Sequence, residues 1–280
     1  MGYVFLFLTV LGFGVSSFFM KLGVQKKHDT FDLSFSLFFI AAIVSAVFFF
    51  LDKSSALSRE VVLLGIGGGI GLAISFICFI KAINAGHYGL SVAIASASFI
   101  VQVLYSIVAW KEPVSLLGIL VILTALFLLA YSSNTKEEGS NKSWLKWFVF
   151  IFLSFLTDGL ALITQAEAAK LPGKNYSTYL FVSYSAGAVF LLFYVLKRRK
   201  LDLKATKYGL FSALGNFAGI FFTLKSLETI TGNIVFPVYF SGYNILGVLL
   251  SVFYLKEKIN IIGYIGIALG ITGIIITFVK

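Results

Sequence analysis

Charged residues are scarce in this 280-residue chain and make up 12% of it, whereas a soluble globular domain carries roughly 25%. Hydrophobic residues take their place and account for 59% of the positions, with phenylalanine alone contributing 31 residues. A chain of this length cannot bury so much apolar surface in one core, so its surroundings must be lipid. The composition therefore excludes a soluble enzyme and a disordered chain.

Cysteine, histidine and the common catalytic motifs are also nearly absent. The single cysteine, Cys78, cannot form an intrachain disulfide, which excludes a disulfide-stapled scaffold. His28 and His87 have no partner at metal-ligand spacing, and the chain contains no phosphate-binding glycine loop, His-Glu-x-x-His pair or Gly-x-Ser-x-Gly turn. We therefore expect no metal and no cofactor, and we predict that the protein is not an enzyme.

Ten apolar runs are each long enough to cross a bilayer, which takes roughly 20 residues. The runs lie at about 2–23, 31–51, 61–83, 88–110, 114–131, 144–168, 176–196, 206–228, 231–255 and 259–279. They are unbroken rather than alternating, which excludes the strands of a membrane barrel. The sequence thus predicts an all-α integral membrane protein with ten transmembrane helices.

The two halves of the chain are related to each other. Phe79–Ile83 (FIKAI) recurs 144 residues later as Thr223–Leu227 (TLKSL), and the Lys111-Glu112 pair recurs as Lys256-Glu257. Five helices per copy is an odd number, so the second copy must enter the membrane from the opposite side. We predict two inverted five-helix repeats, 1–131 and 144–280, joined by a linker at 132–143. Inverted repeats of this kind are typical of secondary transporters.

The opening segment Gly12–Lys21 (GFGVSSFFMK), and a Lys-Glu pair ahead of a Gly-rich last helix in each half, carry a resemblance to a known family. The chain resembles the EamA family of the drug/metabolite transporter superfamily. It departs from that family at Phe13, where a Trp is often found, and the repeat counterpart of Phe13 is Asp158. The resemblance implies movement of small metabolites through a central cavity between the halves.

Polar side chains recur at helical spacing in several runs, which predicts that they line one cavity. The stripes fall in the fourth, sixth, eighth and ninth runs. The candidate substrate-binding residues are Ser98, Gln102, Asp158, Asn216, Thr223, Tyr239, Tyr243 and Asn244. By contrast, Trp144 and Trp147 suit the aromatic belt at a membrane surface.

Three charged residues lie inside the runs and each has two interpretations. Asp158 is near the middle of its run, where an ionised carboxylate costs about 2.5–3.5 kcal/mol. It is either a proton-coupling or amine-binding group, or a protonated or hydrogen-bonded packing residue. Lys81 and Lys225 are repeat-related and lie near helix ends, where they either snorkel to the interface or form gate contacts for anionic cargo. Pairing of Lys225 with Glu228 would favour the structural role.

The leading hypothesis is a secondary transporter of the cytoplasmic membrane that moves a small polar metabolite, an amino acid or similar, by alternating access. Proton coupling and exchange both stay open, and the alternative is a lipid-linked substrate flippase or a membrane scaffold without ion coupling. The expected partners are a small-molecule substrate, the lipid bilayer and protons as a candidate coupling ion. The net charge of +10 comes from loop clusters suited to anionic lipid, so no nucleic acid is expected. The oligomeric state stays open.

The orientation of the chain in the membrane is also open. Thirteen Lys and Arg residues lie in one set of alternate connections and six in the other. The positive-inside rule then places both termini outside the cell, whereas the family resemblance implies that they lie inside.

Overall fold

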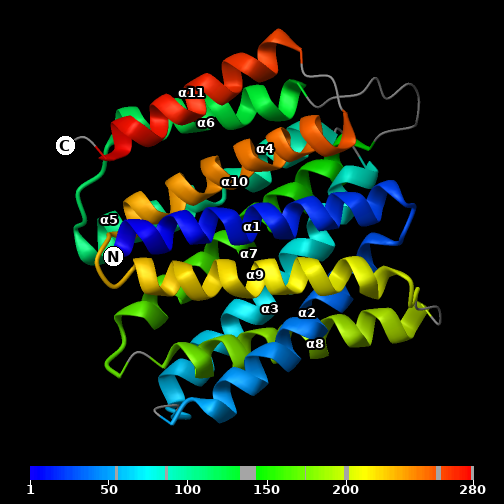
Figure 1. Ribbon diagram of the computed structural model, residues 1–280, viewed down its shortest axis with the longest axis vertical. Helices are drawn as coiled ribbons and strands as arrows, with labels where there is room; N and C mark the ends of the chain where they lie inside the picture. The colour runs from blue at the N-terminus through cyan, green and yellow to red at the C-terminus, as the bar shows by residue number, and fades with distance from the viewer. Residues whose placement is uncertain are drawn as a thin grey trace. The chain divides into compact units, whose positions relative to one another are not determined.

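The computed structural model describes residues 1–53, 56–85, 88–132, 143–173, 175–198, 202–256 and 260–278, and within these ranges it contains helices and no strand (Figure 1). The helices are α1 (Gly2–Gln25), α2 (Thr30–Leu51), α3 (Arg59–Ala85), α4 (Tyr88–Ser96), α5 (Phe99–Trp110), α6 (Leu116–Ser132), α7 (Trp144–Lys170), α8 (Tyr176–Arg198), α9 (Ala205–Ser226), α10 (Gly232–Leu255) and α11 (Ile261–Phe278). Eight helical segments of the described chain are long and apolar enough to cross a membrane. One of them, Leu90–Trp110, combines α4 and α5; α6 is a shorter apolar helix, and α9 belongs to neither group.

The helix bounds follow the apolar runs closely because a helix is the form in which a chain segment satisfies its own backbone hydrogen bonds in lipid. One expectation was wrong. The run at 88–110, predicted as a single helix, is divided into α4 and α5 by a turn at Ala97 and Ser98.

The internal repeat is visible in how two helices end. Lys111 caps the end of α5 and Lys256 caps the end of α10, and both lysines have a left-handed backbone with a φ of 54°. In each case the lysine N–H donates to the carbonyl of the serine five residues earlier, Ser106 or Ser251. Side chains other than glycine rarely take this conformation, so its recurrence at both repeat-related Lys-Glu pairs supports the internal repeat. Glu257, most of the predicted linker and His87 lie outside the described residues.

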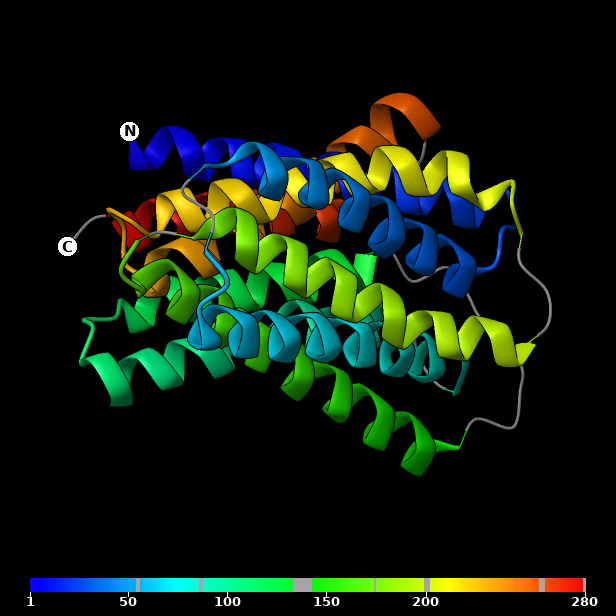
Figure 2. The same cartoon turned by 90° about the horizontal axis from the view of Figure 1, so that it is seen from below.

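The helices form two compact units, and each unit combines segments from both halves of the sequence. The first unit contains Met1–Ile74 and Leu160–Ile230. In it α1 packs along α9, as Figure 1 shows, and α2 packs along α8, as Figure 2 shows. α1 and α9 approach each other so closely that a Cβ on Gly12 would lie 2.6 Å from the backbone nitrogen of Gly219. Small residues allow this approach in lipid, where no hydrophobic force drives helices together.

The second unit contains Ser75–Gly159 and Thr231–Lys280. Here α6 packs along α11, and α10 contacts α5, α6 and α11 (Figure 1). Trp147 on α7 is 4% exposed, and its indole N–H donates to Ser91 Oγ at 2.9 Å. Trp147 therefore packs inside the protein, whereas Trp144 is 66% exposed, and the position of both at a membrane surface stays a prediction. Trp147 packs in a small apolar cluster with Ala82 and Ile151.

Candidate functional site

The turn between α4 and α5 provides the framework of the candidate site in the second unit. The N–H groups of Ser98, Ile100 and Val101 each bond the carbonyl three residues earlier, which tightens the helix to a 3₁₀ path. A short stretch of this kind within a helix often marks a functional hinge. Ser98 itself is fully buried at this point.

Asp158 reaches the turn from α7, and Ser98 donates its hydroxyl hydrogen to Asp158 Oδ2. Gly159 makes the approach possible, because a Cβ at this position would lie 2.4 Å from Val101 Cβ and 2.9 Å from the carbonyl oxygen of Ser98. No cation forms an ion pair with Asp158 within the described part of the chain. A carboxylate has about four acceptor positions, so the single bond from Ser98 leaves Asp158 able to bind further donors.

The Tyr243 side chain of α10 lies close to this carboxylate. The Asp158 carboxyl group acts electrostatically on the Tyr243 hydroxyl, which is also within hydrogen-bonding reach of the Ser96 and Asn244 side chains. The rings of Tyr239 and Tyr243 stack with their centroids 6.3 Å apart. Asn244 donates its amide to the carbonyl oxygen of Phe240 on the same helix at 2.7 Å. The structure thus brings together four of the sequence-predicted residues: Ser98, Asp158, Tyr243 and Asn244.

Gln102 lies one helical turn beyond Ser98 on α5 and is fully buried. Neither its amide nitrogen nor its amide oxygen has a hydrogen-bond partner among the described residues. Its Nε2 packs against the first residue of α10, since a Cβ on Gly232 would lie 2.6 Å from it. A buried amide without partners is costly, and each such group in a native structure requires an explanation.

The other predicted polar residues belong to the first unit and are engaged there. Asn216 accepts a hydrogen bond from the Tyr184 hydroxyl at 2.7 Å, and the fully buried Thr223 donates to the carbonyl oxygen of Gly219 on its own helix at 2.8 Å. We predict that these residues line one cavity together with those of α5, α7 and α10, and this stays a prediction.

The two repeat-related lysines make different contacts. Lys225 Nζ is 3.1 Å from Glu228 Oε1 and 5.1 Å from the centre of the Tyr176 ring. Lys81 Nζ lies 5.3 Å from the centre of the Phe150 ring. The ion pair between Lys225 and Glu228 favours a structural role for Lys225.

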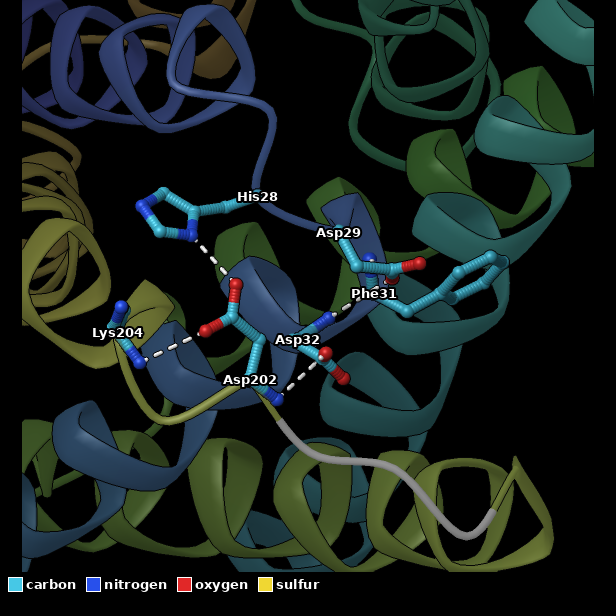
Figure 3. A network of polar contacts seen from close by, with 6 residues as sticks. All are labelled: His28, Asp29, Phe31, Asp32, Asp202 and Lys204. Carbon is cyan, nitrogen blue, oxygen red and sulfur yellow. Dashed lines mark hydrogen bonds and ion pairs between the residues drawn. The ribbon is translucent and has the colours of Figure 1, made fainter.

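A polar network that sequence reasoning missed connects two loops of the first unit (Figure 3). His28 Nδ1 lies 2.6 Å from Asp202 Oδ2, and the backbone N–H of Asp202 donates to Asp32 Oδ2 at 3.0 Å. Asp29 caps the start of α2 by accepting from the N–H of Phe31 at 2.8 Å. The hydrogen bond from His28 holds the pKa of Asp202 below its usual value. His28 and Asp202 are 174 positions apart in the sequence, so no local motif could reveal this pair.

Pairs of hydrogen-bonded serines are a second feature that the helical spacing of polar residues did not predict. Ser154, one helical turn before Asp158 on α7, bonds Ser75 of α3 at 3.1 Å, and Ser16 of α1 bonds Ser212 of α9 at 2.9 Å. These hydroxyl groups join neighbouring helices. Across the described residues no group of three His, Cys, Asp or Glu side chains is arranged to hold a metal ion.

The sequence model of the EamA-like transporter family matches residues 1–133 and, separately, residues 145–279. The chain belongs to the EamA-like transporter family. The two matched segments give it the two-repeat architecture of that family, within the drug/metabolite transporter superfamily. Members of the family are membrane transporters rather than enzymes, and the apolar helices make this chain a multi-pass membrane protein.

Two individual proteins are similar to this member of the EamA-like family. An uncharacterized protein of Haemophilus influenzae is 23% identical over 267 residues, which cover 89% of each chain. A crystal structure of a protein is similar over 97% of this chain and 98% of the chain in that structure, with a TM-score of 0.75 and 13% sequence identity. The second likeness shows that the fold is one already seen in a solved structure.

Proposed function

We propose that the protein is a secondary transporter that moves a small polar metabolite, an amino acid or similar, across the cytoplasmic membrane by alternating access. In this proposal the helices make ten membrane crossings in two inverted five-helix repeats, with α4 and α5 counted as one crossing. The family match in two halves and the recurrent ends of α5 and α10 support the repeat. Inverted repeats support alternating access because one repeat can rock against the other around a fixed site.

The observation that carries the proposal is the meeting of Asp158 with the interrupted helix α4–α5. Transporters bind cargo and coupling ions where membrane helices are discontinuous, because the exposed backbone and side chains there serve as ligands. A carboxyl group in this setting is costly and marks a functional site by default. The Ser98 hydroxyl, the Tyr243 ring and the spare acceptor positions of Asp158 suit either a proton or the amine group of a cargo.

Asp158 gives the transporter a means of coupling to protons. When the site opens to water on one side, the ionised carboxylate is hydrated and can release its proton. When it closes, the low dielectric favours the neutral acid. Each cycle would then link the release of one proton to the movement of cargo.

Reconstituted vesicles test this function with a radiolabelled mixture of L-amino acids, with and without a pH gradient. The wild-type protein should accumulate label under the gradient. Asp158→Asn, which mimics the protonated acid, should retain exchange of label between the two sides but lose its response to the gradient. Glu60→Gln makes the same chemical change at an exposed position at the start of α3 and should behave as the wild type.

Two results would count against the proposal. Accumulation by the Asp158→Asn variant under a pH gradient would show that Asp158 is not the coupling residue. Transfer of a fluorescent lipid between leaflets by the wild-type protein, without movement of label, would support the flippase instead.

A further inference from the structure

The start of α10 presents hydrogen-bond donors that the described residues leave unused. The first N–H groups of any helix have no partner within the helix, and together they carry a partial positive charge. In α10 the N–H groups of Ile234 and Val235 bond the carbonyl oxygen of Thr231, whereas those of Gly232 and Asn233 have no partner among the described residues. The first turn of α10 contains no acidic side chain that could neutralise this charge.

Two side chains at the same place are also without partners. Thr231 stands at the N-cap position, yet its hydroxyl does not cap the helix, and Thr231 Oγ1 is buried with no hydrogen bond to a described residue. α5 and α10 are in contact (Figure 1), and the buried amide of Gln102 packs directly against Gly232. The side chain that native helices use for capping and the nearest buried amide are therefore both available to a ligand.

The surroundings fix this end of α10 in place. Asn233 accepts a hydrogen bond from the Ser106 hydroxyl, and its amide donates to the carbonyl oxygens of Glu112 and Pro113 at 3.3 Å. Asn233 thus ties α10 to the end of α5, and its side chain is occupied. Lys111 and Glu112 after α5 carry one formal charge of each sign; the Lys111 side chain is exposed, whereas Glu112 Oε2 is buried.

We propose that the start of α10 is a carboxylate-binding subsite, formed by the N–H groups of Gly232 and Asn233, the amide of Gln102 and the hydroxyl of Thr231. Helix N-termini bind anions through their free N–H groups, and in transporters they point at anionic groups of the cargo. With no unpaired Lys or Arg in its described lining, the subsite suits a singly charged carboxylate rather than a phosphate dianion.

The position of this subsite deepens the proposed function, on which this step rests. Gln102 is one turn from Ser98, and Ser98 bonds Asp158, so an amine site and a carboxylate site lie about one helical turn apart. A small amino acid carries both groups and would bind with its ammonium at Asp158 and its carboxylate at the start of α10.

Thermal unfolding of the purified protein in detergent tests the subsite without requiring transport. Sodium propionate supplies a carboxylate with no amine, and sodium chloride at equal ionic strength is its control. Propionate should raise the Tm of the wild-type protein above its value in chloride. Gln102→Leu should lose this shift, with propionate binding weakened at least about tenfold, and the ligand-free variant should be no less stable because two unpaired buried atoms are removed.

Two further variants keep the test decisive if Gln102→Leu fails to fold. Gly232→Ala places a methyl group 2.6 Å from Gln102 Nε2, which a flexible side-chain end can avoid by moving, so the fold should survive while the propionate shift is lost. Gln165→Leu makes the same substitution at another buried glutamine, in the first unit, and should keep the shift.

A propionate shift that is absent from the wild-type protein, or that persists in Gln102→Leu and Gly232→Ala, overturns the subsite. Failure of the proposed function looks different. In that case the vesicles show no uptake of labelled amino acids while the propionate shift and its loss on mutation remain.

Discussion

Replacing Gly159 with alanine places a methyl group where α7 passes the turn between α4 and α5. The new Cβ would lie 2.4 Å from Val101 Cβ, 2.7 Å from Val101 Cγ2 and 2.9 Å from the carbonyl oxygen of Ser98. Contacts this short include a backbone atom and a branched side chain, so neither neighbour can simply rotate away. The two helices must separate, and the hydrogen bond from Ser98 to Asp158 must lengthen.

The expected cost of Gly159→Ala follows from these two effects. Overpacking a tight contact costs about 1–3 kcal/mol, and weakening a hydrogen bond to a charged group adds roughly 1.5–3 kcal/mol if the carboxyl is ionised. Alanine is otherwise favoured over glycine in a helix by about 1 kcal/mol, which offsets part of the loss. We expect a net destabilisation of about 1.5–5 kcal/mol, together with loss of gradient-driven uptake.

Gly67→Ala is the matched control because it is also a glycine within a membrane helix. Its nearest neighbour would be Thr164 Cγ2 at 3.8 Å, an ordinary van der Waals contact. Unfolding of both variants in mixed micelles, monitored by circular dichroism, gives the free energies to compare. If Gly159→Ala is as stable as Gly67→Ala and transports normally, the close approach of α7 to the turn does not hold the site together.

Three further outcomes are expected. The lowered pKa of Asp202 means that the folded protein binds this proton less tightly than the unfolded chain, so Asp202→Asn should lower the Tm at neutral pH. The difference should begin to shrink near the usual carboxyl pKa of 3.8 and vanish once the pH has fallen below the lower pKa of the folded state. Tyr184→Phe removes the donor to Asn216 and should cost about 1 kcal/mol in the free energy of unfolding. Lys225→Met breaks a partly exposed ion pair and should change that free energy by less than about 1 kcal/mol with uptake intact; loss of uptake by a stable variant would assign Lys225 to the cargo path instead.

The helices were predictable because a chain segment in lipid must satisfy its own backbone hydrogen bonds, which a helix does. For example, α2 begins at Thr30, one residue before the apolar run predicted at 31–51. The division between α4 and α5 was not predictable in this way. Residues 95–99 (ASASF) contain neither proline nor glycine, which are the usual causes of a helix break. Gly159 of α7, about 60 residues further on, packs its backbone against this turn, and such a contact leaves no local sequence signal.

Part of the candidate site was predictable because a charged residue is unusual in an apolar run. Asp158 stands out in the sequence because a carboxylate in an apolar run is costly, but the helical spacing of its polar neighbours does not say which hydroxyl it meets. The pairing of His28 with Asp202 was missed because each residue lies in a short loop, and only the packing of α1, α2 and α9 brings the loops together.

Polarity within a membrane helix is therefore a weak guide to ligand binding, and unused hydrogen-bonding capacity is a stronger one. Ser154 satisfies its hydroxyl against Ser75, and Thr223 does so against its own backbone, so the fold alone already gives each of them a partner. Gln102 has two buried amide atoms without described partners, and Asp158 accepts one described hydrogen bond where a carboxylate can accept several. An unsatisfied buried group costs stability on its own, so its persistence is reasonable where a ligand completes it. By this criterion the proposed binding residues are those that the fold leaves incomplete, around the turn between α4 and α5 and the start of α10.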